Sequence, residues 1–178
     1  MASAHPRYFY GNISYSLTVS DRVGNAGTSA TNAVTIPLQG FSTFGTDMPG
    51  CHGAHVLGVG TAPTVNNPEF SMTCTGGPPS SMSLCLVTDS QGTGLDIFGV
   101  GIPVWADVIA ASNVFGLDGP IDGTGTATAA AAIPNNPGLA GGNFYFQFIF
   151  YEASCNPAFS TSGAAPSRSC RKAGFVAV

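Results

Sequence analysis

The chain has 178 residues, of which 24 are Gly and 13 are Pro but only 8% are charged, and its net charge is −4. All five basic residues lie near the two ends, so that no Lys or Arg occurs between Val23 and Ser167. An acidic surface repels nucleic acid, and no apolar run approaches the roughly 20 residues of a membrane-spanning helix. We therefore expect neither nucleic-acid binding nor membrane insertion, and the weakly charged composition predicts an extracellular or cell-surface protein.

The fold is predicted to be all-β. Gly and Pro are spread along the chain and interrupt any helical pattern, including the Ala-rich run 127–132, which is followed by Pro134. The length is enough for one β-sandwich, of jelly-roll or immunoglobulin-like type, together with an extension. We place the extension at residues 1–40 and the sandwich at residues 41–178.

The extension is predicted to be a β-strand arm or hairpin. Its first strand has apolar residues at every second position, as expected of a strand with one buried face: Ile13, Tyr15, Leu17 and Val19. Residues 33–38 form the expected partner strand, after a turn that contains Gly24, Asn25 and Gly27. A hairpin alone is only marginally stable in water, so this arm should pack on its own domain or on a neighbour.

Two short segments contain candidate metal ligands. His52 and His55 follow Cys51, and imidazole and thiolate bind zinc or copper, but surface histidines in a turn explain this segment better. Asp118 and Asp122 each precede a Gly. Carboxylates in such a loop can bind calcium, although Asp-Gly is itself a strong turn signal. We expect turns and no cofactor, with calcium as the alternative at the aspartates.

Five cysteines at spacings that fit no zinc ribbon indicate disulfides. Cys74 and Cys85 flank a Gly- and Pro-rich stretch, and a hairpin there would place them opposite each other. Cys155 and Cys170 flank a second loop that is rich in Ser, Gly and Pro. We predict these two pairs, which would leave Cys51 unpaired or linked to another molecule.

The segment 144–151, FYFQFIFY, is apolar on both faces of a predicted strand. Its four Phe residues point to one face, and the other face carries Tyr145, Gln147, Ile149 and Tyr151. Such a strand is normally central in its sheet and covered on both sides. If the chain's own domain left one face open, an incoming strand or subunit would have to cover it.

Four motifs occur in order from Phe44 onward: FGTDMPGC, NPEFSMTCTGGPP, LDIFGVGIPVWAD and IPNNPGLAGGNFYFQFIFYE. Together they resemble a family of small extracellular β-domains at the C-terminal ends of secreted planctomycete and myxobacterial proteins. The family often has a second Cys near Ile102, which is missing here, so the resemblance leaves the bonding of Cys51 in question. It implies a compact β-sandwich and brings no catalytic residue or ligand. The earlier segment YSLTVSDRVGNAGTSATNAVTI is similar to the final hairpin of bacterial immunoglobulin-like domains.

No catalytic motif is present that would predict an enzyme. There is no Gly-x-Ser-x-Gly sequence, and neither Glu69 nor Glu152 lies in a recognisable acid/base motif. We predict a secreted structural subunit whose arm donates a strand to another copy, building an extracellular filament, sheath or surface layer. The alternative is an adhesin-like or carbohydrate-binding module of a larger secreted protein, in which aromatic rings such as that of Trp105 would contact glycans.

Overall fold

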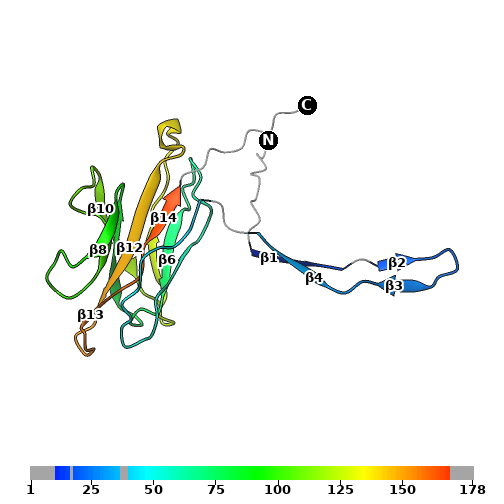
Figure 1. Ribbon diagram of the computed structural model, residues 1–178, viewed down its shortest axis with the longest axis horizontal. Coiled ribbons are helices and arrows are strands. Elements are labelled where there is room, and N and C mark those ends of the chain that lie inside the picture. The colour runs from blue at the N-terminus through cyan, green and yellow to red at the C-terminus, as the bar shows by residue number, and fades with distance from the viewer. Residues whose placement is uncertain (1–10, 17, 37–39, 169–178) are drawn as a thin grey trace. The chain divides into compact units, whose positions relative to one another are not determined.

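The computed structural model describes residues 11–16, 18–36 and 40–168 (Figure 1). These residues form β-strands and the loops between them, apart from one short 3-10 turn. The all-β prediction is therefore confirmed. The chain divides into two compact units, residues 1–39 and residues 40–178. In the part of the chain that the structure describes, no helix is long and apolar enough to cross a membrane.

The first unit is a β-hairpin, as predicted. Strand β1 (Gly11–Tyr15) pairs antiparallel with β4 (Asn32–Ile36), and β2 (Thr18–Ser20) pairs antiparallel with β3 (Ala26–Thr28). The carboxylate of Asp21 organises the turn, since it accepts hydrogen bonds from the side chain of Asn25 and from the backbone N–H groups of Asn25 and Val23, each at 2.9 Å. These bonds, with that of the Asn25 side chain foremost, lower the pKa of Asp21.

The second unit is a β-sandwich of two main sheets, and a two-stranded hairpin that packs on the outer face of the first sheet forms a third, smaller layer. The first sheet has the order β10 (Val114–Pro120), β7 (Met82–Thr88), β12 (Asn143–Tyr151), β13 (Phe159–Thr161), with β14 (Ala165–Arg168) also paired to β12. The second sheet has the order β11 (Ala127–Ala130), β6 (Ser71–Thr75), β5 (Val56–Val59). Strands β8 (Gln91–Leu95) and β9 (Val104–Ala106) form a hairpin, and a 3-10 turn spans Pro137–Leu139.

Strand β12 is central and is buried on both faces from residue 146 to residue 150, which confirms the prediction for this part of the aromatic segment, whereas Tyr151 at its end is exposed. Phe146, Phe148 and Phe150 are fully buried in the core between the two sheets. On the opposite face, Ile149 packs in a second cluster that contains Val104 of β9. Burying one such side chain contributes about 1.5–3 kcal/mol, so β12 is the main hydrophobic element of the domain.

Gln147, the polar residue in the middle of β12, links the third layer to the first sheet through hydrogen bonds of its side chain. Its Oε1 accepts hydrogen bonds from the backbone N–H groups of Trp105 at 2.8 Å and Ala106 at 3.4 Å. Its Nε2 donates to the carbonyls of Pro103 at 2.8 Å and Ser162 at 3.0 Å. Because the side chain is 0% exposed, these bonds satisfy an amide that would otherwise be costly to bury.

Candidate functional site

The sandwich is open along the side formed by β10 and β11. A single turn connects the end of β10 to the start of β11, and Ile121 and Ala127 form a bridge at this turn. Away from the turn, β10 pairs with β7 in the first sheet and β11 pairs with β6 in the second. Facing sheets lie about 10 Å apart, so the two strands diverge with distance from the turn. Among the described residues, no further strand pairs with the outer edge of β10 or β11.

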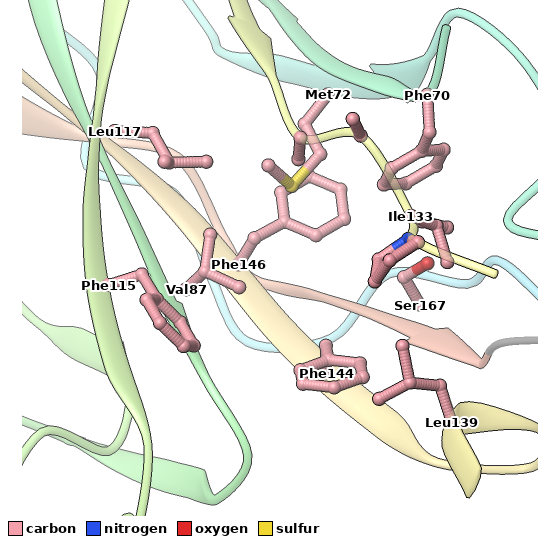
Figure 2. Close-up of a pocket in the computed structure, with 13 residues that line it drawn as sticks. Phe70, Met72, Val87, Phe115, Leu117, Ile133, Leu139, Phe144, Phe146 and Ser167 are labelled. Atoms are coloured by element: carbon pink, nitrogen blue, oxygen red, sulfur yellow. The ribbon is translucent and has the colours of Figure 1, made fainter. Parts of the chain in front are cut away.

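An apolar pocket of about 340 Å³ lies where these two strands have separated (Figure 2). Phe115 and Leu117 of β10 lie on one side of it, and Ile133 and Leu139 lie across from them. Among the lining side chains, only Ser167 carries a polar group. A site with this lining provides no acid, base or nucleophile pair, and it suits apolar side chains or an apolar ligand.

Sequence reasoning did not identify this pocket. A signal was present in segment 114–118, where Phe115 and Leu117 alternate with Gly116 and Asp118, the pattern of a strand with one apolar face. The pattern predicts a buried face, yet Phe115 is 50% exposed. Only the arrangement of the two sheets shows that the expected cover is missing.

The residues predicted to drive assembly lie in the hairpin of the first unit. Tyr15 is 49% and Val19 is 70% exposed, and both belong to strands that pair on one side only within the described residues. Ile13 lies on β1 opposite Val34. Leu17 is outside the described residues. The structure thus places the described part of the predicted apolar stripe on a hairpin with a free outer edge.

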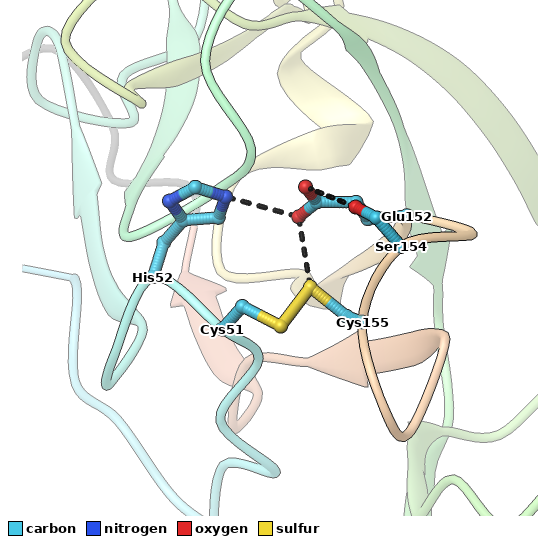
Figure 3. The surroundings of a disulfide bond; sticks show 5 residues. All are labelled: Cys51, His52, Glu152, Ser154 and Cys155. Atoms are coloured by element: carbon cyan, nitrogen blue, oxygen red, sulfur yellow. Dashed lines mark hydrogen bonds and ion pairs between the residues drawn. A yellow bond between two sulfur atoms is a disulfide. The ribbon is translucent and has the colours of Figure 1, made fainter.

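Cys51 forms a disulfide with Cys155 (Figure 3), so the prediction that Cys51 is unpaired or linked to another molecule is wrong, and so is the Cys155–Cys170 pairing. Cys170 itself lies outside the described residues. The reason is the path of the chain before Cys51. Phe44 bridges Ala164 and Met48 bridges Thr161, which carries Cys51 to the loop that follows β12 and gives the two cysteines a Cα–Cα distance of 5.8 Å.

Cys74 and Cys85 are free thiols in the core, so the predicted bond between them is absent. The prediction assumed a hairpin within one sheet. In the structure Cys74 lies on β6 of the second sheet, and Cys85 lies on β7 of the first, so the Gly- and Pro-rich connection crosses between sheets. Burial raises the pKa of Cys74 to about 12 and also raises that of Cys85, which keeps both thiols protonated and unreactive near neutral pH.

The candidate ligand His52 is engaged beside the disulfide (Figure 3). Its Nε2 lies 2.9 Å from Oε2 of Glu152, whose other oxygen accepts a hydrogen bond from Ser154 at 3.0 Å. Oε2 also lies 3.0 Å from Sγ of Cys155, but a disulfide sulfur carries no proton and cannot donate. The contact between His52 and Glu152 therefore connects two loops. The adjacent cavity is only about 10 Å³, the size of one water, and offers no room for a substrate.

The other candidate ligand, His55, is buried and not on the surface as predicted. It is 8% exposed, and its ring stacks on Phe150 with the centroids 4.6 Å apart. Neither ring nitrogen makes a hydrogen bond of standard geometry in the described part of the chain. Burial lowers the pKa of His55, and the smaller opposing effects of the Thr75 carbonyl and the Asp47 carboxylate do not offset it. The ring is therefore neutral in the folded protein at neutral pH.

Acidification is expected to destabilise the protein through His55. The unfolded chain binds a proton at this residue near the ordinary pKa of about 6.5, whereas the folded pKa is lower. The contribution of His55 is thus fully present above about pH 6.5 and is lost as the pH falls below it. Denaturant unfolding at pH 7.5 and pH 5.0 should show a smaller loss of stability in His55→Phe than in the original protein. Equal losses in both proteins would contradict this assignment.

The two candidate aspartates have different environments, and the predicted turn is found at only one of them. Asp118 is an exposed residue of β10, so a turn is absent there. Asp122 lies in the turn before β11, where its Oδ1 accepts hydrogen bonds from the Thr124 hydroxyl at 2.7 Å and from the N–H groups of Thr124 and Thr126 at 2.8 and 2.9 Å. These bonds, led by that of the Thr124 side chain, lower the pKa of Asp122. Within the described residues, no group of three or more His, Cys, Asp or Glu side chains could hold a metal ion.

Trp105, whose ring was considered for glycan binding, is half-buried and packs closely against two glycines. A Cβ on Gly45 or Gly94 would lie within 2.6 Å of its indole, and both glycines have positive φ angles, of 71° and 78°. Its Nε1 donates to the carbonyl of Thr46 at 3.0 Å. The ring is held between two glycines that no larger residue could replace, which is a structural role.

Comparisons with protein-family models, with curated proteins and with solved structures found no match to this chain. The resemblance to extracellular C-terminal β-domains stays a prediction.

Proposed function

We propose that this protein is a secreted structural subunit that assembles with copies of itself into an extracellular filament, sheath or surface layer. The hairpin arm carries the proposal. Its side chains from Ser14 to Ala33, Leu17 apart, are all exposed, including those of Tyr15, Val19 and Val23. Isolated hairpins are marginally stable in water, so an arm with this apolar content gains stability when a partner covers it.

Secretion is supported by the chemistry of the second unit. Its disulfide joins Cys51 to Cys155, and structural disulfides persist mainly in oxidising compartments outside the cytoplasm. The absence of Lys and Arg between Val23 and Ser167 fits the same setting.

Assembly by an arm leads naturally to a polymer. The donating surface of one copy differs from the accepting surface of the next, so the contact is head-to-tail. Unless the rotation between copies closes a ring, such contacts continue into an open chain. Backbone hydrogen bonds of the added strand would supply affinity, and its alternating side chains would supply specificity.

Electron microscopy of the purified protein at neutral pH tests this function. We expect regular filaments, tubes or sheets from the full chain, and dispersed particles after Tyr15 and Val19 are both changed to Ser. Fluorescence of Trp105, which lies in the second unit, should be unchanged in this variant and serves as the control for folding. Dispersed particles from the original protein would contradict the proposal and favour the carbohydrate-binding alternative, for which a glycan screen is the next measurement.

A further inference from the structure

We propose that the pocket beside β10 accepts the arm of a second copy. In this complex, the outer edge of the β1 and β2 strands pairs with the outer edge of β10, and Tyr15 and its apolar neighbours enter the pocket. The inference rests on the self-assembly proposed above and names its acceptor site.

Both edges are free to pair. β10 pairs only with β7, and β1 and β2 pair only with β4 and β3, among the described residues. An edge strand that is not protected by charge or Pro is a template for another strand. The first half of β10, Val114–Leu117, has neither, while Asp118 and Pro120 occupy its second half.

The pocket has room for side chains from an added strand. A cavity of about 150 Å³ holds one benzene ring, so the volume of about 340 Å³ fits two side chains of that size. Residues two apart on a strand point to the same face and are about 6.8 Å apart. The sequence offers such a series at Ile13, Tyr15, Leu17 and Val19.

The charges of the two units favour this contact. Residues 1–39 contain Arg7, Arg22 and Asp21, for a net charge of 2 − 1 = +1. Residues 40–178 contain eight of the nine acidic residues and three basic ones, for a net charge of 3 − 8 = −5. Arg22 follows β2 and Asp118 lies on β10, and both are exposed. Charges of opposite sign speed the encounter and select the partner.

The length of the connection assigns the acceptor to a second copy. Phe41 bridges β14 at the opposite side of the first sheet from β10, so four strand spacings separate Phe41 from β10 through β14, β12 and β7. If the arm bound its own domain, β1 would lie beyond β10, and β4, which ends at Ile36, would lie beyond β1, so that Ile36 would be six spacings from Phe41. At about 4.8 Å each this is about 29 Å along the sheet. The five residue steps from Ile36 to Phe41 reach at most about 18 Å when fully extended. An arm from another molecule has no such limit.

A charge placed in the pocket should abolish assembly. In Phe115→Glu, a half-exposed pocket side chain becomes a carboxylate, which loses hydration when an apolar strand covers it. The matched control is Met82→Glu, which alters a 56% exposed residue on the outer face of the neighbouring strand β7. By sedimentation and electron microscopy, we expect at least a tenfold loss of polymer for Phe115→Glu and none for Met82→Glu. Polymer that forms equally in both variants would overturn the inference.

A cross-link identifies the donor. We would mix a Tyr15→Cys copy with a Phe115→Cys copy of different mass, both also carrying Cys170→Ser so that this cysteine cannot compete, and oxidise them with a small-molecule disulfide. Cys74 and Cys85 are buried and should not compete. A disulfide joining the two masses supports the assignment, and Tyr15→Cys mixed with Met82→Cys is the control. A Tyr15→Cys, Phe115→Cys double variant that cross-links only within single molecules would overturn the second-copy assignment.

These outcomes separate the acceptor site from the function itself. If the original protein makes no polymer, the self-assembly proposal fails. If polymer forms, but Phe115→Glu still assembles and Tyr15→Cys does not cross-link to Phe115→Cys, only the acceptor assignment fails. Native mass spectrometry that finds a small apolar molecule bound to assembled subunits, and lost in Phe115→Glu, would show the pocket to be a ligand site instead.

Discussion

Replacing both Cys51 and Cys155 by Ser is expected to lower the free energy of unfolding by about 4 kcal/mol. The disulfide joins residues that are 104 positions apart, and cross-linking a loop of about 100 residues removes unfolded-state entropy worth up to about 4.7 kcal/mol. Urea unfolding of the full chain, followed by the fluorescence of Trp105, would measure the change.

A reducing agent supplies the matched control for this variant. It should destabilise the original protein by a similar amount and leave the Ser variant unchanged, since the thiols of Cys74 and Cys85 are already free. Alkylation after denaturation without reduction should label Cys74 and Cys85 but not Cys51 or Cys155. Labelling of Cys51 in the unreduced protein would contradict the pairing.

Gln147→Leu is expected to cost about 4 kcal/mol of stability, because it leaves two N–H groups and two carbonyls without partners at about 1–3 kcal/mol each, partly offset by the apolar side chain. The affected groups belong to Pro103, Trp105, Ala106 and Ser162. The third layer should loosen from the first sheet, and Trp105 fluorescence should report it at low denaturant.

Two further variants test the reason for this cost. Gln91→Leu changes an exposed glutamine of β8 and should alter stability by less than about 0.5 kcal/mol. Gln147→Glu keeps the acceptor for Trp105 but aims a carboxylate at the carbonyls of Pro103 and Ser162. At pH 5 a protonated carboxyl can donate a hydrogen bond to one of these carbonyls, so this variant should be more stable at pH 5 than at pH 7. A Gln147→Leu variant as stable as the original would show that the hydrogen bonds matter little.

Features that depend on neighbouring residues in the chain were predictable from the sequence. The hairpin of the first unit followed from alternating apolar residues around a Gly- and Asn-containing turn, and the central position of β12 followed from its two apolar faces. Alternation assigns side chains to the faces of a strand without any knowledge of its partners.

The candidate sites were predictable only in part. His52 was correctly expected on the surface, but His55 is buried against Phe150, more than ninety residues away in the chain. Asp122 was correctly expected in a turn, whereas Asp118 joins β10 through its pairing with Leu84 of β7. For both His55 and Asp118, whose positions were predicted wrongly, the observed position depends on contact with a strand that is distant in the sequence.

Local sequence patterns are sufficient to predict the all-β class, the hairpin arm and the burial of β12 on both faces, because backbone sterics and side-chain alternation act over a few residues. The partner of Cys51, the free thiols of Cys74 and Cys85, and the open pocket beside β10 follow instead from tertiary contacts. Each of these depends on which sheet a strand joins. That choice is made by long-range burial of apolar surface across the whole domain, which no local pattern encodes.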